Sequence, residues 1–265
     1  MAFEPIAIVG RACVLPGALS PGALWEAVVS GSDLLEAAEE GRWGLPHADV
    51  LCPPDADATD RAWSDRGGYV HGFDEVFDPS GFGIPAEEIL RLDPLFHWTL
   101  HVAREALRDA GIDAPLGGGT RTAGARTGAV LGNLSFPSSA MARFAESVWL
   151  GQTREAAGVP ATDPRNRFTS SLPALLLRRA LGLGGDTFAL DAACASALYS
   201  LKLACDRLQD RRADVMLAGA VNRADDLFLH VGFCALEALS KSGRSRPFHR
   251  DADGLVPAEG AGMVV

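Results

Sequence analysis

Hydrophobic residues recur along this chain in two spacings that alternate with one another. Short, continuously apolar runs predict buried strands at 6–10, 127–131, 187–190, 214–221 and 260–265. Apolar residues three and four positions apart predict helices at 21–30, 85–110, 136–148, 164–181, 195–210 and 227–239. Continuously apolar strands that alternate with helices are typical of an α/β protein whose sheet is covered on both faces.

One long segment, residues 31–80, follows neither spacing and is rich in Pro, Gly and Asp. A stretch of this length without regular structure is usually functional or packed against the rest of a domain. We therefore predict a surface excursion that aromatic side chains anchor. The candidate anchors are Trp43, Trp63, Tyr69 and Phe73.

The most informative segment is 189–196, Ala-Leu-Asp-Ala-Ala-Cys-Ala-Ser. The apolar run Thr187–Leu190 predicts a short buried strand, and Ala195–Asp210 predicts the helix that follows it. Cys194 then lies on a tight strand-to-helix turn between small residues. The helix face that we expect to be buried carries Ala197, Leu198, Leu201, Ala204, Cys205 and Leu208.

A cysteine at a helix N-terminus lies near free backbone N–H groups and the positive end of the helix dipole. This setting stabilises the thiolate, which is the nucleophilic form, and small neighbours leave room for a substrate carbonyl. A lone cysteine in an apolar chain is also commonly a small buried hydrophobic residue. Periodicity leaves both interpretations of Cys194 open, whereas Cys205 is expected to be buried and inert.

Composition excludes several classes of protein. The 265 residues are 48% hydrophobic, which suits one large domain or two small ones, and the formal net charge is −10. Nucleic-acid binding is excluded because the densest basic stretch, Arg244–Arg250, is short and is interpreted as a solvated loop. The run Gly117–Gly119 lacks a following Lys-Ser/Thr pair and predicts a flexible loop.

Five cysteines without a CxxC pair predict neither a zinc site nor a disulfide framework. The N-terminus does not resemble a signal peptide, and no apolar run approaches 18 residues. We therefore expect a reducing, cytoplasmic setting, with no membrane span and no bound metal.

Several short groups of residues occur in a characteristic order. They are Glu4–Gly10, Phe82–Ile84, Leu92–Pro94, Asp191–Ser196, Ala218–Asn222, Ser245–Phe248, Asp253-Gly254 and Glu259–Gly262. In this order they resemble motifs of the β-ketoacyl synthases, the condensing domains of polyketide and fatty-acid synthases. The resemblance covers residues 1–265 nearly end to end and corresponds to the N-terminal part of such a domain. Three segments are most similar to iterative enediyne and polyunsaturated-chain synthases: Leu131–Ser138, Tyr199–Asp206 and Asn222–Phe228.

The resemblance implies a thiolase-like fold of two similar α/β halves around a five-layered core. Residues 1–265 would form the N-terminal half and the start of the C-terminal half. It also implies that Cys194 accepts an acyl chain from the phosphopantetheine of an acyl carrier protein, with no cofactor bound by the domain itself. The acyl-enzyme then condenses with the carbanion that decarboxylation of malonyl-carrier protein produces. The backbone N–H of Cys194 would form half of an oxyanion hole.

The departures from the family pattern predict an incomplete enzyme. The family's two catalytic histidines, its lysine and its second oxyanion segment all lie beyond the position that Glu259–Gly262 matches. The histidines of this chain match neither histidine motif: His47, His71, His97, His101, His230 and His249. The chain also stops within the apolar run Gly262–Val265, so we interpret it as a fragment that can be acylated slowly but does not condense.

Two acidic residues, Asp191 and Glu259, match positions near the family's active site, and we expect each to order the backbone rather than to transfer protons. The resemblance also implies homodimerisation through the strand Thr187–Leu190. The face that the missing C-terminal half would cover should be apolar and prone to aggregation unless another chain covers it.

The alternative interpretation is a non-catalytic fragment or split subunit that needs a complementary chain. Cys194 argues that the parent protein is catalytic, because chain-length factors resemble this family but lack that cysteine. A thiolase that uses coenzyme A would share the fold, although the motifs are more similar to synthases. An α/β-hydrolase is disfavoured because the sequence contains no G-x-S-x-G elbow.

Overall fold

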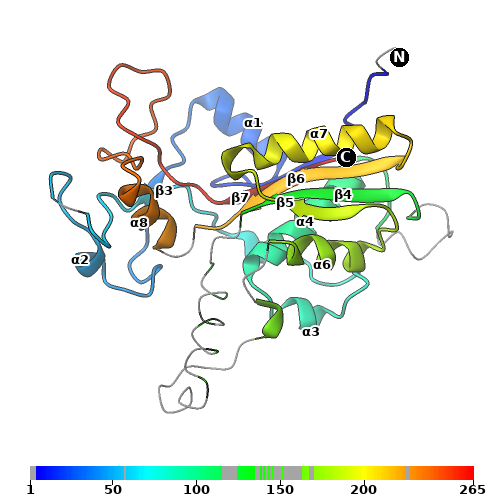
Figure 1. The fold of residues 1–265 in the computed structure, drawn as a ribbon, viewed down its shortest axis with the longest axis horizontal. Coiled ribbons are helices and arrows are strands. Elements are labelled where there is room, and N and C mark those ends of the chain that lie inside the picture. The colour runs from blue at the N-terminus through cyan, green and yellow to red at the C-terminus, as the bar shows by residue number, and fades with distance from the viewer. Residues whose placement is uncertain are drawn as a thin grey trace.

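The computed structural model describes residues 4–56, 58–114, 124–134, 163–166, 170–224 and 227–265, and six single residues between 138 and 151. Figure 1 shows a central sheet with helices on both faces and a group of short elements beyond one end of it. The sheet consists of β1 (Arg11–Val14), β4 (Thr127–Asn133), β5 (Thr187–Leu190), β6 (Val215–Asn222) and β7 (Gly260–Val264).

The longer described helices are α1 (Pro21–Ser30), α4 (Pro94–Asp109), α6 (Leu172–Leu181), α7 (Ser196–Gln209) and α8 (Phe228–Ala235). The short elements are β2 (Glu36–Ala37), α2 (His47–Val50), β3 (Arg66–Gly67) and α3 (Ala86–Ile89). Single 3-10 turns are η1 (Phe73–Glu75), η3 (Pro164–Asn166) and η4 (Ala193–Ala195). None of the described helices is long and apolar enough to cross a bilayer.

The five strands lie in the order β1-β7-β6-β4-β5. Strand β4 is parallel to both of its neighbours, with Leu131 opposite Ala189 of β5 and Gly219 of β6. Strands β1 and β7 are antiparallel to each other, and β7 is antiparallel to β6. Because β4, β5 and β6 run in one direction, their carboxyl ends meet at one edge of the sheet, the usual place for a site in such folds.

Helices cover both faces of this sheet, as the continuously apolar strands predict. Helix α7 packs on one face and helices α4 and α6 on the other (Figure 1). Successive residues of β4 serve the two faces: Val130 packs in the cluster with Ala204 of α7, and Leu131 packs in the cluster of α4 and α6. The predicted α/β architecture is confirmed.

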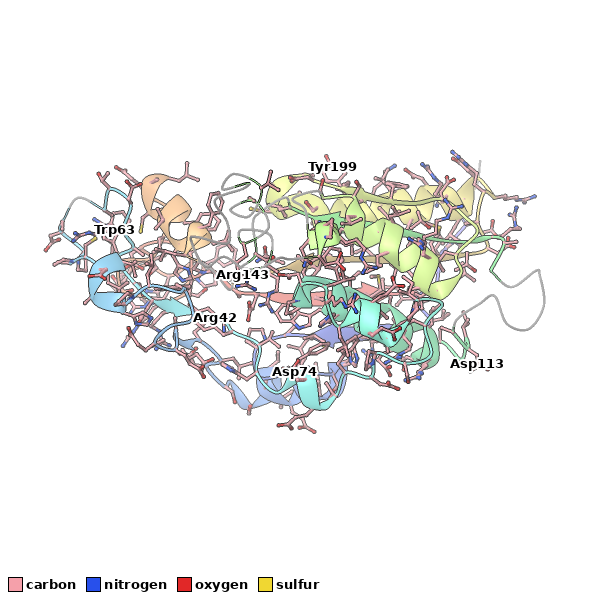
Figure 2. All side chains as sticks on the ribbon, turned by 90° about the horizontal axis from the view of Figure 1, so that it is seen from below. Arg42, Trp63, Asp74, Asp113, Arg143 and Tyr199 are labelled. Carbon is pink, nitrogen blue, oxygen red and sulfur yellow. The ribbon has the colours of Figure 1, made fainter. Side chains whose placement is uncertain are left out.

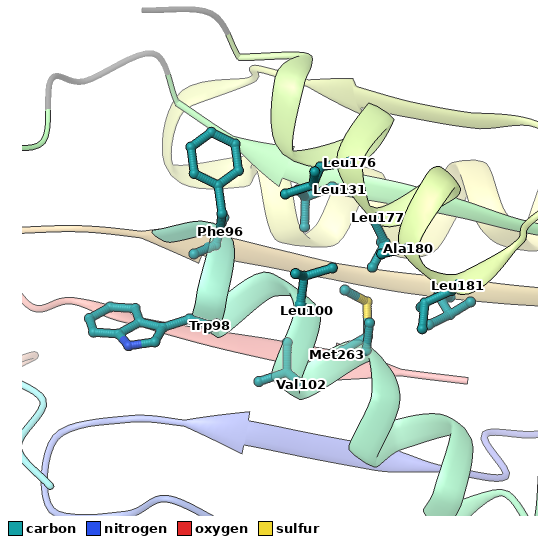
Figure 3. Packing of buried hydrophobic residues seen from close by; sticks show 14 of the residues in the cluster. Phe96, Trp98, Leu100, Val102, Leu131, Leu176, Leu177, Ala180, Leu181 and Met263 are labelled. Atoms are coloured by element: carbon teal, nitrogen blue, oxygen red, sulfur yellow. The ribbon is translucent and has the colours of Figure 1, made fainter. Parts of the chain in front are cut away.

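The larger core cluster lies between the sheet and helices α4 and α6. Figure 3 shows Phe96 and Leu100 of α4 beside Leu177 of α6, with Leu131 and Met263 extending from the sheet. Of these, Phe96, Leu100 and Leu177 are completely buried. Each such side chain contributes about 1.5–3 kcal/mol relative to an exposed one, so this interface contributes strongly to the stability of the fold.

The helix predicted at 85–110 is interrupted. Helix α3 ends at Ile89, and α4 begins at Pro94 after Asp93, whose backbone is extended with ψ 143°. A residue before proline is disfavoured in the helical region, which explains the break. The Asp93 carboxylate then accepts a hydrogen bond from the N–H of Leu95 at 2.8 Å, so the predicted N-cap is confirmed.

Two further predictions on helices differ from the structure. Of the helix predicted at 164–181, the described residues form a 3-10 turn, η3, and then α6. Leu175, predicted to be buried, is 52% exposed, because α6 packs through the face that carries Leu176 and Leu177. The glycine run at 117–119 and most of the helix predicted at 136–148 lie outside the described residues.

The predicted N-terminal strand is displaced along the chain. Residues Arg11–Val14 form β1, whereas Ile8 and Val9 are 65% and 57% exposed. The pairing with β7 places Arg11 opposite Val264 and Val14 opposite Ala261, so the strand follows the predicted apolar run rather than coinciding with it.

The predicted excursion at 31–80 contains only short elements and is anchored by aromatic residues. Trp43, Tyr69 and Phe73 are buried, and Trp63 is half-buried. The excursion is joined to the segment before β7, because the N–H of Gly68 donates to the carbonyl of Pro257 and the N–H of Glu259 donates to the carbonyl of Gly68, both at 2.9 Å. It therefore packs against the carboxyl edge of the sheet.

Candidate active site

Cys194 lies on the turn between β5 and α7, at the carboxyl edge of the sheet. The turn is the 3-10 segment η4, and the side chain of Cys194 is exposed. The strand-turn-helix setting predicted for this residue is confirmed, and the interpretation of Cys194 as a small buried residue is wrong. Strand β5 is half-buried rather than buried, because it forms the edge of the sheet.

Two side chains hold this turn. The carboxylate of Asp191 accepts the N–H of Ala193 at 2.9 Å, so its expected role in ordering the backbone agrees with the geometry. The hydroxyl of Ser196 accepts the N–H of Ala192 at 2.9 Å and donates to the carbonyl of Ala193 at 2.7 Å. These bonds maintain Ala193 at φ 50°, a left-handed conformation that is costly for a residue with a Cβ.

The backbone N–H of Cys194 takes no part in these bonds. Its neighbours on either side, Ala193 and Ala195, both donate within the turn, but the N–H of Cys194 has no acceptor among the described residues. A free backbone donor beside a nucleophile is what an oxyanion hole requires.

A cavity of about 540 Å³ opens beside the thiol. Its wall is almost entirely apolar and comes from β4, β6, α8 and the segment that leads into β7. The lining includes Gly132, Leu229, Phe233, Val256 and Glu259. The size and polarity of this space fit an acyl chain or another slender apolar group.

The absence of a side chain at Gly132 lets α7 begin this close to the sheet. A methyl group at this position would lie 2.9 Å from the backbone carbonyl carbon and from the Cβ of Ser196. The same glycine lines the cavity, so it sets both the position of the Cys194 turn and the space in front of it.

Comparison with known proteins decides the family. The model of the family described as "Beta-ketoacyl synthase, N-terminal domain" matches residues 3–265. The chain belongs to this family. The motif-based resemblance is therefore confirmed, and the finer similarity to enediyne and polyunsaturated-chain synthases stays a prediction.

Relatives with similar sequences are polyketide synthases and related enzymes. Pikromycin polyketide synthase component PikAIII of Streptomyces venezuelae is 35% identical over 264 residues, which cover 99% of this chain and 16% of that protein. Mycoketide-CoA synthase of Mycobacterium tuberculosis (strain ATCC 25618 / H37Rv) is 34% identical over 271 residues, 99% of this chain and 6% of that protein. The chain thus spans only 16% and 6% of the length of these two curated relatives.

Solved ketosynthases have the same fold. PfaC Keto synthase-Chain length factor superposes with a TM-score of 0.85 at 34% identity, over 97% of this chain and 28% of that one. The oxazolomycin ketosynthase domain OzmH KS7 of Streptomyces albus JA3453 superposes with a TM-score of 0.78 at 29% identity, over 97% and 42% of the two chains. The thiolase-like fold expected for the chain is confirmed.

Helix α7 of this ketosynthase domain is less buried than its periodicity predicts. Ser196, Ser200 and Ala204 are the buried residues of α7, whereas Leu198 and Tyr199 are 71% and 55% exposed. Figure 2 shows Tyr199 at the outer surface of this helix. The apolar residues of α7 therefore lie on two faces of the helix, one that packs against the sheet and one that is exposed. The spacing of apolar residues had placed both sets on a single buried face.

The prediction for Cys205 is wrong in part, because the residue is half-buried rather than buried. It borders a second cavity, of about 510 Å³, between α7 and the residues before β1. Cys13, Cys52 and Cys234 are buried, and burial raises the pKa of the Cys13 and Cys234 thiols. None of the described cysteines forms a disulfide.

All six histidines lie in the described parts of the chain, and none of them lines the Cys194 cavity. His97, His101 and His230 are buried, and desolvation lowers the pKa of each, that of His230 to about 4. His249 is exposed and contacts Asp251. The described residues also contain no cluster of His, Cys, Asp and Glu that could hold a metal ion.

Glu259 is a polar residue in this apolar wall. It is 2% exposed, and its carboxylate accepts backbone N–H groups. These bonds agree with the expectation that Glu259 orders the backbone. The motif match alone could not show that the residues contacting it come from two distant segments of the chain.

Proposed function

We propose that this ketosynthase domain is the acyl-accepting part of a condensing acyltransferase and that Cys194 is its nucleophile. The observation that carries this proposal is the exposed thiol of Cys194 on the η4 turn, beside an apolar cavity and a backbone N–H that no described residue accepts. In such a domain the acyl donor is a thioester on the phosphopantetheine arm of an acyl carrier protein.

The first half of the reaction is a transfer between two sulfur atoms. The thiolate of Cys194 attacks the thioester carbonyl, a new C–S bond forms, and the carbonyl oxygen takes the negative charge. The backbone N–H of Cys194 is placed to donate to that oxygen, and one such donor is worth about 2.7–4 kcal/mol of barrier. The intermediate then collapses, the bond to the pantetheine sulfur breaks, and the released thiolate takes a proton from solvent.

The second half of the reaction requires groups that this cavity does not carry. Decarboxylation of a malonyl thioester leaves an enolate that family members stabilise with histidines, and no histidine of this chain lines the cavity. We therefore assign acyl loading to the described residues and propose that condensation depends on residues supplied by a C-terminal half of the domain.

Dimerisation through β5 is part of the proposal. Strand β5 forms the edge of the sheet, is paired with β4 on one side, and is half-buried along its length. An unpaired edge strand is a template for pairing with a second copy of itself.

A second proposal is that the chain works only with a complementary chain. Apolar side chains of α1 and α7 support it: Trp25, Val28 and Leu198 are 68%, 64% and 71% exposed. An apolar surface of this kind on a folded domain marks an interaction site or an aggregation hazard.

Intact-protein mass spectrometry after mixing the chain with an acyl carrier protein thioester tests the main proposal. We expect one acyl adduct that maps to Cys194, that disappears in Cys194→Ala and that persists in the matched variant Cys205→Ala. An adduct at another residue, or none on a chain that circular dichroism shows to be folded, would refute Cys194 as the acceptor in this chain. Loading that occurs only after addition of a complementary C-terminal half would support the second proposal.

A further inference from the structure

One carboxylate joins three segments of the chain at the wall of the Cys194 cavity. Oε1 of Glu259 accepts from Arg42 Nη2 at 2.6 Å and from the N–H of Val70 at 2.9 Å. Oε2 accepts from the N–H of Ala224 at 3.1 Å, and Nε of Arg223 lies 4.0 Å away. The donors thus come from the excursion and from the segment that follows β6.

The cations around this carboxylate are held by aromatic rings. The guanidinium of Arg42, a residue labelled in Figure 2, lies 4.2 Å from the ring centroid of Tyr69. The guanidinium of Arg223 lies 4.4 Å from the ring centroid of Trp98 in α4. Tyr69 is 1% exposed and its hydroxyl donates to the carbonyl of Asp65 at 2.9 Å. The ring that contacts the Arg42 guanidinium is therefore held in place.

The same residue is built into the cavity wall through its backbone. Residues 255–262, which include Glu259, all line the cavity beside Cys194. This wall segment is held from the excursion by the two bonds with Gly68, and from β6 by the side chain of Asn222, which donates to the carbonyl of Ala258 at 2.8 Å. Removing the carboxylate leaves buried donors on both sides without an acceptor.

We propose that Glu259 and Arg42 are positioning residues that set the width of the cavity for the acyl chain. The proposal rests on the proposed role of Cys194 as acyl acceptor, and it adds the ion pair that shapes the cavity beside this residue. The Cys194 turn itself is held by Asp191 and Ser196 and not by Glu259, so the pair acts on the space in front of the thiol and leaves the thiol in place.

The substitution Glu259→Gln tests this with little change in volume. An amide presents one acceptor and one donor, so its NH₂ group must face either Ala224 N–H or the donors at Oε1. We expect the rate of transfer of a long acyl chain from a carrier thioester to fall about tenfold or more, because small displacements of a positioning group are costly. Transfer of an acetyl group and alkylation of Cys194 by iodoacetamide should change about twofold at most, since neither depends on the far wall.

A second variant, Arg42→Gln, allows the proposal to be tested even if Glu259→Gln does not fold stably. Arg42→Gln should show the same selective loss of long-chain transfer. The double variant should lose no more than Glu259→Gln alone, because that variant already lacks the Arg42–Glu259 ion pair. Glu105→Gln is the matched control: it removes a half-exposed carboxylate that pairs with Arg104 and Arg108 on α4 and does not line the cavity, so the ratio of long-chain to acetyl transfer should stay unchanged. An unchanged ratio in both Glu259→Gln and Arg42→Gln would overturn the proposal.

Hydrogen exchange separates this proposal from the assignment of Cys194. If wild type is not acylated at Cys194, the assignment of the nucleophile fails. The wall can still be measured, because Glu259→Gln should speed amide exchange at Val70, at Ala224 and across 255–260 by about tenfold or more if the carboxylate holds them. Unchanged exchange at all of these amides would refute the positioning role whatever the acylation result.

Discussion

The hydroxyl of Ser196 donates to the carbonyl oxygen of Ala193 at 2.7 Å, across the residue that carries the proposed nucleophile. The same hydroxyl accepts a hydrogen bond from the N–H of Ala192 at 2.9 Å. One side chain at the start of α7 therefore closes the loop of backbone on which Cys194 is displayed. It also stabilises the left-handed conformation of Ala193, which would be unfavourable without these hydrogen bonds.

The substitution Ser196→Ala should release this turn. We expect the free energy of unfolding to fall by about 1–3 kcal/mol, because a buried hydroxyl with two hydrogen bonds is lost. Alkylation of Cys194 should become less selective over the other thiols as the turn relaxes. Urea unfolding and peptide-mapped labelling measure the two effects.

Ser200→Ala is the matched control for this experiment. Ser200 is equally buried on α7, and its hydroxyl donates to the carbonyl of Ala197 at 2.7 Å within the helix. Its loss should cost stability without changing the reactivity of Cys194. Equal effects of both variants on Cys194 would show that Ser196 has no special role in the turn.

Of two glycines that line the cavity, only Gly132 should lose stability when a methyl group is added. Gly132→Ala places a Cβ 2.9 Å from the backbone of Ser196, and we expect a destabilisation of about 1–3 kcal/mol together with slower acyl loading. Gly262→Ala meets nothing within 4 Å, so its free energy of unfolding should stay within about 0.5 kcal/mol of wild type. Thermal unfolding of the two variants is a direct comparison, and equal melting temperatures would contradict the close approach at Gly132.

Acid should destabilise the fold through His230. Burial lowers the pKa of this residue from 6.5 to about 4 in the folded protein, and its ring lies between Trp43 and Tyr69. On acidification the His230 side chain is protonated near pH 6.5 in the unfolded chain but only near pH 4 in the folded protein. The contribution of neutral His230 to the free energy of unfolding is therefore fully present above pH 6.5. It decreases between pH 6.5 and pH 4 by about 1.4 kcal/mol per pH unit, or about 3 kcal/mol in total.

Urea midpoints of wild type and His230→Gln between pH 7.5 and 4.5 measure this contribution. The variant should be less stable at pH 7.5 but should lose less stability on acidification. His249→Gln, at an exposed position, is the control and should follow wild type. Parallel pH profiles for wild type and His230→Gln would mean that another group controls the acid response.

The thiols should react in an order that follows their burial. Cys194 is exposed, Cys205 is half-buried, and the remaining three are buried. We expect iodoacetamide to label Cys194 first and Cys205 more slowly. Cys13 and Cys234 should be labelled last, because burial raises the pKa of both thiols and so lowers the thiolate fraction. Labelling of Cys205 as fast as Cys194 in the native state would contradict this order.

Local sequence was sufficient to place Cys194. An apolar strand, three small residues and an amphipathic helix lie next to one another in the chain, so the turn between them follows from short-range geometry. The N-cap of α4 at Asp93 was predictable for the same reason, because the carboxylate and the N–H that it binds are two residues apart.

Burial was predicted less well than helix position. Spacing placed Leu198 and Cys205 on one buried strip of α7, whereas Leu198 is 71% exposed and Cys205 is half-buried. Periodicity shows that a helix has an apolar face but does not show how much of that face the rest of the chain covers. The start of β1 was misplaced for a similar reason, since its register depends on where β7 lies.

By itself the sequence determined the α/β class, the strand-turn-helix setting of Cys194 and the family, because these depend on residues that are neighbours in the chain or on motifs read in order. Only the tertiary structure decided that Arg42 and the N–H of Ala224 both donate to the carboxylate of Glu259. Arg42 and Glu259 lie 217 positions apart in the sequence. A contact over that distance in sequence forms only when β6 pairs with β7 and the excursion packs against the ends of these strands.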